Sequence, residues 1–146
     1  MIRDEVLAQY DALRRTSCDA GMRREEDGEI VRLVGIEQAV GCVVYSRLDV
    51  QCADAAIVRQ REYFHALNFD FEWKWHSHDQ PQNLQQRLIA HGFEAEEAET
   101  ILVLALDEFP EVLNTNSDID IRRVEASREL EDLRRIEEIV WGRRER

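Results

Sequence analysis

The stretch FDFEWKWHSHDQPQNLQQRLIAHGF (69–93) carries the clearest structural signal in the sequence. In its first part, aromatic residues occupy every second position, and charged or polar residues stand between them. That alternation predicts a half-buried β-strand over 69–78. The second part keeps a helical spacing of apolar residues, so it predicts a helix that Asp79 caps and Gly92 ends.

The regions on either side of this stretch predict a mixture of helices and strands. Before it, two segments with helical spacing enclose Val- and Ile-rich runs that are broken by turn signals such as Asp27-Gly28. Such runs predict antiparallel strands joined by tight hairpins. After it, an apolar run predicts one more buried strand. The expected elements are helices over 2–20, 53–67, 79–92 and 127–141 and strands over 22–25, 29–35, 39–48, 69–78, 100–106 and 119–125.

Composition and charge exclude several classes of function. The chain is 44% apolar, with a formal net charge of −12 and a pI near 4.8. A broad surface for nucleic acid or for an anionic membrane is therefore not expected. The three cysteines have no metal-like spacing, which indicates a reducing compartment. No apolar run approaches the roughly 20 residues of a membrane span. We expect a soluble, cytoplasmic protein.

The order of elements, together with one local pattern, resembles the GCN5-related N-acetyltransferases, the acyl-CoA N-acyltransferase superfamily. In tandem members, a strand of FEWK type runs into SHD, then into a P-x-x-L helix that ends in GF, then into an acidic turn and an apolar strand. This chain carries these features in the same order between 71 and 106. The resemblance implies an α+β fold, an acyl-CoA N-acyltransferase-like mixed, mostly antiparallel sheet flanked by helices on both faces.

The resemblance also implies a division of the chain. Residues 1–107 resemble the non-catalytic N-terminal domain of a tandem member, and 108–118 form a linker. Residues 119–146 resemble the first strand and helix of a second, catalytic copy, which would be truncated here. Because exposed sheet edges invite pairing, we expect a homodimer through this C-terminal strand and helix, with a catalytic domain of the same superfamily as another partner.

The loop that should bind the coenzyme departs from the pattern of the resembled family. There, the loop between the fourth strand and the next helix reads Q/R-x-x-G-x-G/A and grips the pyrophosphate of acyl-CoA. Here it reads SRLDVQCADAA (46–56), with no glycine. Arg47 is followed by Asp49 and Asp54, acids that favour a helix N-terminus but repel phosphate. We expect Asp54 to cap the helix and this chain to bind no cofactor; acetyl-CoA would serve a full-length parent.

Candidate site residues come from the two strands that separate in the resembled fold to admit the acyl chain. These strands are 39–48 and 69–77 here, and the candidates for a remnant cleft are Tyr45, Glu72, Trp75 and His76. Aromatic residues at strand spacing belong more often to the hydrophobic core than to a pocket, so the core interpretation stays open beside the cleft interpretation. The run His76-Ser77-His78-Asp79 supplies too few ligands for a metal site, and none is expected.

Two hypotheses about function follow. The first is a non-catalytic domain that resembles the GCN5-related N-acetyltransferases (GNAT) and has a structural or interaction role. The alternative is an active small acyl-CoA-dependent N-acyltransferase with an atypical coenzyme loop. Release of a free thiol from acyl-CoA in the presence of amines would separate them.

Overall fold

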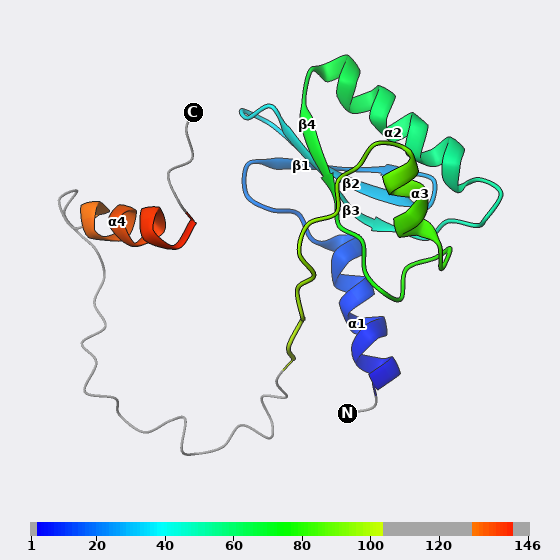
Figure 1. The fold of residues 1–146 in the computed structure, drawn as a ribbon, viewed down its shortest axis with the longest axis horizontal. Coiled ribbons are helices and arrows are strands. Elements are labelled where there is room, and N and C mark those ends of the chain that lie inside the picture. The colour runs from blue at the N-terminus through cyan, green and yellow to red at the C-terminus, as the bar shows by residue number, and fades with distance from the viewer. Residues whose placement is uncertain (1–2, 104–129, 142–146) are drawn as a thin grey trace. The chain divides into compact units, whose positions relative to one another are not determined.

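The computed structural model describes residues 3–103 and 130–141, which fall in two units, Met1–Leu102 and Val103–Arg146. The first unit is an α+β domain built on a four-stranded mixed sheet, as predicted (Figure 1). In the second, the structure describes a single amphipathic helix. The elements in chain order are α1 (Arg3–Thr16), β1 (Met22–Asp27), β2 (Ile30–Gly35), β3 (Val40–Ser46), α2 (Ala53–Leu67), β4 (Asp70–Trp73), α3 (Leu84–Ala90) and α4 (Leu130–Trp141).

The sheet has the order β1-β2-β3-β4. The first three strands pair antiparallel through short turns, and β4 pairs parallel to β3 after the crossover through α2. The Asp27-Gly28 turn forms as predicted, with Gly28 at a φ of +62° that favours glycine. The predicted three antiparallel strands are therefore confirmed. Within the described residues, no helix has the length and apolar character that crossing a membrane requires.

The main core lies between the sheet and the helices α2 and α3. Phe64 of α2 is fully buried and stacks on Phe71 of β4 at 4.4 Å between ring centroids. Gly41 of β3 makes room for that ring, because a Cβ built at Gly41 would lie 2.0 Å from a Phe64 carbon. The buried members of this core are Ile30, Val34, Val43, Leu48, Ala53, Ala56, Ile57, Phe64, Leu84 and Leu88.

The sheet is also buried on its other face. Val31 and Leu33 alternate along β2 with residues of the main core, and they are equally buried. Helix α1 packs on β3, and the guanidinium of Arg14 lies 5.3 Å from the centre of the buried Tyr45 ring. Arg14 is the buried residue of α1, and the apolar side chains of Val6 and Leu7 are partly buried.

The helix predicted over 2–20 ends earlier than expected, at Thr16, and three other predicted elements differ from the structure. The strand predicted over 69–78 ends at Trp73, because the chain then leaves β3. The helix predicted from Asp79 begins at Leu84, after Asn83. Residues 100–103 are not in a strand and are exposed, so the prediction of a buried strand there is wrong.

Of the elements predicted for the C-terminal part, only one helix lies within the described residues. The helix predicted over 127–141 is observed as α4, and its apolar face is exposed, with Leu133 at 52% and Val140 at 60%. Residues 104–106, the linker 108–118 and the strand 119–125 lie outside the described residues.

Candidate functional site

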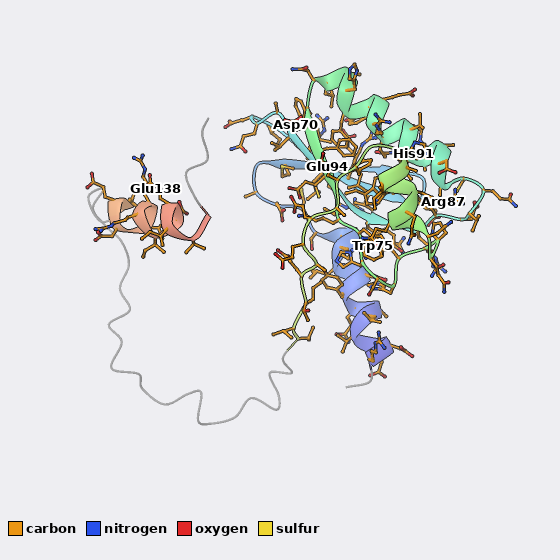
Figure 2. The ribbon with its side chains drawn as sticks, viewed as in Figure 1. Asp70, Trp75, Arg87, His91, Glu94 and Glu138 are labelled. Carbon is orange, nitrogen blue, oxygen red and sulfur yellow. The ribbon has the colours of Figure 1, made fainter. Side chains whose placement is uncertain are left out.

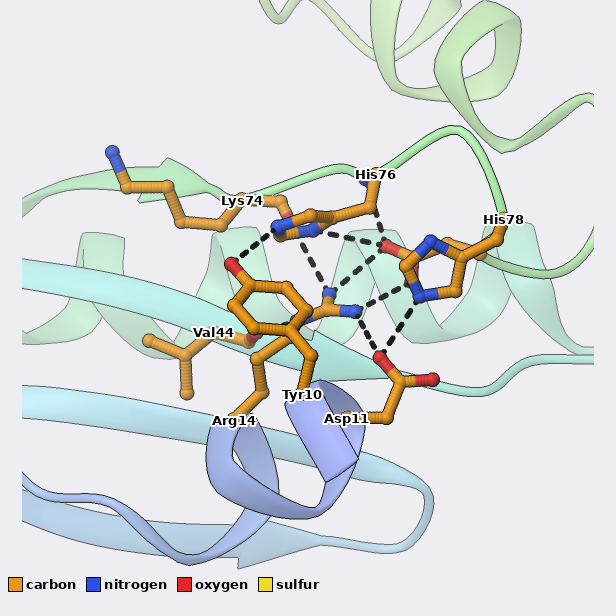
Figure 3. A network of polar contacts seen from close by, with 8 residues as sticks. Tyr10, Asp11, Arg14, Val44, Lys74, His76 and His78 are labelled. Carbon is orange, nitrogen blue, oxygen red and sulfur yellow. Dashed lines mark hydrogen bonds and ion pairs between the residues drawn. The ribbon is translucent and has the colours of Figure 1, made fainter. Parts of the chain in front are cut away.

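The candidate site lies where β3 and β4 stop pairing. Regular pairing ends at Val43 and Trp73, and the Lys74 N–H then donates to the Val43 carbonyl at 2.9 Å. The two segments meet again just after β3, at an isolated bridge between Arg47 and Gln80, where the Leu48 N–H also donates to the Gln80 carbonyl. Between these two points a side chain from α1 joins the two segments (Figure 3).

That side chain is Arg14. Its Nε donates to the Val44 carbonyl at 3.0 Å, and its Nη2 donates to the Lys74 carbonyl at 3.4 Å. The guanidinium also makes two hydrogen bonds to the Asp79 carboxylate, at 2.8 and 3.0 Å. Arg14 and Asp79 expose only 5% and 2% of their side chains. A buried, bidentate ion pair thus fills the gap between the diverging segments.

Asp79 serves this ion pair instead of capping α3. Its carboxylate also accepts the backbone N–H of His76 at 3.0 Å. Burial, the largest single influence, raises the pKa of Asp79. The combined effect of its hydrogen bonds with His76 and of the hydrogen bonds and charge of Arg14 is larger, so the pKa lies below the ordinary value. Burial lowers the pKa of Arg14, and its bonds to Asp79 and Asp11 raise it above the usual range. Both groups are therefore charged at neutral pH.

A ring of partly exposed polar residues surrounds the buried pair (Figure 3). The Tyr10 hydroxyl and the His76 Nε2 are 3.0 Å apart, and the two rings meet edge to face. His78 Nε2 lies 2.9 Å from the Asp11 carboxylate, which also accepts a bond from Arg14. Tyr10 and Asp11 come from α1, whereas the histidines come from the loop after β4. The site thus joins residues that are more than sixty positions apart in sequence.

The predicted cleft residues do not form a single site. Tyr45 is buried, with the guanidinium groups of Arg14 and Arg15 each 5.3 Å from its ring centre. Trp75 is half-buried against the main core, which favours the core interpretation. His76 belongs to the polar ring. Glu72 is exposed and pairs with Lys74 instead.

Asp11, His78 and Asp79 bring their ligand atoms within 4.8 Å of one another, which is close enough for a metal ion. Arg14 Nη1, however, donates to both carboxylates, at 2.9 Å to Asp11 and 2.8 Å to Asp79. The guanidinium therefore supplies the positive charge that a cation would bring, and the donor set does not fit a metal while Arg14 is in place.

The loop at the start of α2 is closed by its own acidic residue. The Asp49 carboxylate accepts the backbone N–H groups of Gln51 at 2.8 Å and Cys52 at 2.7 Å. The Asp49 carbonyl accepts the Ala53 N–H at 3.1 Å. These bonds, that of Cys52 above all, lower the pKa of Asp49, so the carboxylate is ionised at neutral pH. Three N–H groups at the approach to α2, those of Gln51, Cys52 and Ala53, are thus occupied and are not free to bind an anion.

Asp54 does not cap α2, contrary to the prediction. The N-cap is Cys52, and Asp54 stands in the first turn of the helix. Its carboxylate bonds to Arg87 and lies 3.2 Å from His91 Nε2, so it ties α2 to α3. Figure 2 shows these two partners, Arg87 and His91, at α3. Arg47 is exposed, and its backbone N–H donates to the Glu29 carbonyl.

Sequence reasoning missed three members of the site, Tyr10, Asp11 and Arg14. One signal was available: Val6, Tyr10 and Arg14 are four apart and share one face of the helix. An arginine that continues an apolar row is a candidate for a buried ion pair, although its partner could not be read from local spacing.

None of the protein-family models, curated proteins or solved structures compared with the chain matches it. Function is therefore inferred from the geometry of the Arg14 site and of the Asp49 loop.

Proposed function

We propose that this chain is an acyl-CoA N-acyltransferase-like domain that has no catalytic role and acts in structure or interaction. Its fold agrees with that proposal in having three antiparallel strands followed by a parallel fourth. The proposed location is the cytoplasm. The proposed partner is a catalytic domain of the same superfamily.

The observation that carries the proposal is the state of the loop before α2. A diphosphate needs free backbone N–H groups and a helix N-terminus without competing negative charge. Here the Asp49 carboxylate takes two of those N–H groups, and Asp54 adds a second negative charge in the first turn. A diphosphate would have to displace one carboxylate and remain close to the other. The loop therefore opposes coenzyme binding by both geometry and charge.

The Arg14 site supports the same proposal. In the resembled fold, an acyl chain enters where the two parallel strands separate. In this chain the corresponding carbonyls, those of Val44 and Lys74, both accept hydrogen bonds from Arg14. Entry of an acyl chain would break these bonds and leave the Asp79 carboxylate buried without its partner, which is costly.

Calorimetric titration of the full chain with acetyl-CoA tests the proposal. We expect no saturable heat, while an active acetyltransferase titrated in parallel binds normally. Micromolar affinity would contradict the proposal, as would a crystal soaked in acyl-CoA that showed its diphosphate against the backbone amides of residues 47–55.

The alternative, an active small N-acyltransferase, is favoured by one contact. The Tyr10 hydroxyl and His76 Nε2 form a hydrogen-bonded pair suited to proton transfer, beside the point where the strands separate. The alternative predicts that free thiol is released from acetyl-CoA when amines are supplied. It further predicts that this activity is lost on His76→Asn or on a change at Tyr45 or Glu72. No thiol release across a panel of amines would exclude it.

A further inference from the structure

Two features, the outer edge of β4 and the segment that follows Phe93, have no backbone partner within the described residues. β4 is the last strand of the sheet and pairs with β3 on one side only. Residues 94–103 form no helix or strand, are exposed throughout, and end in an apolar run. In that run Ile101, Leu102 and Val103 expose 51%, 88% and 60% of their surface. An open sheet edge and an exposed apolar segment rich in β-branched residues each favour association.

The two edges of the sheet are not equivalent. Both faces of β1 carry charged pairs, Arg23 with Glu25 on one and Arg24 with Glu26 on the other. Charged side chains of this kind discourage an edge from accepting another strand. β4 carries its exposed charges, Asp70 and Glu72, on one face only, and its other face holds the partly buried aromatic residues Phe71 and Trp73. The edge that can accept a strand is therefore that of β4.

The chain that leads to the apolar segment starts beside this same edge. The Phe93 ring packs on Phe71 at 5.3 Å and on Trp73 at 6.2 Å, edge to face in both cases. The pKa of Lys74, the residue after β4, is raised chiefly by its hydrogen bond to Glu72, and the charge of Glu96 also contributes. The acidic run that precedes the apolar segment therefore begins next to the end of β4.

We infer that residues 100–103 of one copy pair with β4 of a second copy, and that the exchange is reciprocal. Donor and acceptor belong to the same chain, so two copies satisfy both in a closed, two-fold symmetric arrangement. The lengths agree, because the donor and β4 (Asp70–Trp73) are four residues each. This surface is separate from residues 119–146 and from the coenzyme loop.

Sedimentation of the full chain over a range of concentrations tests the inference. We expect a dimer that Ile101→Pro weakens at least tenfold, because proline removes a backbone donor and ends strand pairing. Leu102→Lys should weaken the dimer similarly, since an exposed charge opposes edge pairing. Ala95→Pro is the matched control: it lies in the same exposed segment but before the pairing residues, and it should leave the dimer unchanged.

A second control, Leu133→Asp, removes an exposed apolar residue of α4 and should also leave the dimer unchanged. Amides of β4 should exchange hydrogen more slowly as the dimer forms. A monomeric wild-type chain, a dimer that survives Ile101→Pro, or a dimer lost on Leu133→Asp would each overturn the inference. So would protection of the β4 amides in a monomer, which would mean that the segment pairs with its own strand. None of these results depends on whether acetyl-CoA binds.

Discussion

Arg14 and Asp79 form a bidentate ion pair, with hydrogen bonds of 2.8 and 3.0 Å and both side chains almost fully buried. The pair joins α1 to the loop that follows β4, at the point where that loop leaves the sheet. Through the Val44 and Lys74 carbonyls it also holds the two diverging segments together. An ion pair, a contact that commonly occurs at protein surfaces, is here buried and links a helix to the sheet.

Removal of the Arg14 charge should therefore destabilise the fold strongly. Arg14→Met leaves the Asp79 carboxylate buried without a partner, and loss of one member of a buried pair costs about 3–5 kcal/mol. Urea unfolding of the variant and the wild type measures this difference. Arg23→Met is the control, because Arg23 forms an exposed pair with Glu25 and should have little effect.

The double variant Arg14→Met, Asp79→Leu should recover part of the lost stability. It removes the unpaired charge and places two apolar side chains in the same space. A double variant that is less stable than Arg14→Met would show that the hydrogen bonds to the Val44 and Lys74 carbonyls, rather than the ion pair, hold the segments together.

The same pair predicts how stability depends on pH. The pKa of Asp79 in the folded protein lies below its usual 3.8, the value we take for the unfolded chain. The contribution of Asp79 is therefore complete above pH 3.8 and is lost as the pH falls through the lower, folded pKa. Unfolding free energies of wild type and Asp79→Asn, measured from about pH 7 to about pH 2, should differ most at neutral pH. A difference that grew in acid would contradict this assignment.

The sequence was informative wherever the structural signal was local. The apolar face of 53–67 predicted α2 to the residue, because each turn of that helix contributes a buried side chain and Asn68 ends it in a left-handed conformation. The alternation of 69–75 correctly placed the aromatic residues toward the core. The Asp27-Gly28 turn needs only its own two residues to be recognised.

The failures occurred where residues distant in sequence meet. Asp79 stands before a proline and a helical pattern, which is the local signature of a cap, yet Arg14 binds it from sixty-five positions away. Asp54 was likewise interpreted within its own helix, although its partner is Arg87 of α3. In both cases the local rule was physically sound, but a tertiary ion pair took the carboxylate instead.

The three cysteines should differ sharply in reactivity. Burial, as the largest influence, raises the pKa of Cys42 to about 11, whereas Cys18 and Cys52 are exposed. Near pH 8 only about one Cys42 thiol in a thousand is ionised, and the thiolate is the reactive form. Brief treatment with iodoacetamide followed by peptide mass spectrometry should find Cys18 and Cys52 modified. Labelling of Cys42 at the same rate in the folded protein would contradict its partly buried position on β3, between Leu33 of β2 and Glu72 of β4.

The contact between Gly41 and Phe64 predicts a substitution that the core cannot accept. A Cβ at Gly41 would lie 2.0 Å from the Phe64 ring, so Gly41→Ala must displace a fully buried side chain. Such overpacking costs about 1–3 kcal/mol in unfolding free energy. Phe64→Leu leaves space for the new methyl group, so the double variant should lose less stability than the sum of the two single variants. Additive losses would mean that the ring and the glycine do not compete for the same volume.

The Asp49 carboxylate accepts hydrogen bonds from two backbone N–H groups before α2. Asp49→Gly frees those donors and removes a negative charge, so it should raise the affinity for inorganic pyrophosphate. Asp49→Asn keeps an oxygen acceptor in the same place but removes the charge, and it separates the two effects. If Asn and Gly raise the affinity equally, charge repulsion is the barrier; if only Gly does, the occupied N–H groups are the barrier. Titration calorimetry measures both, and unchanged affinity in both variants would show that Asp49 does not keep phosphate out of this loop.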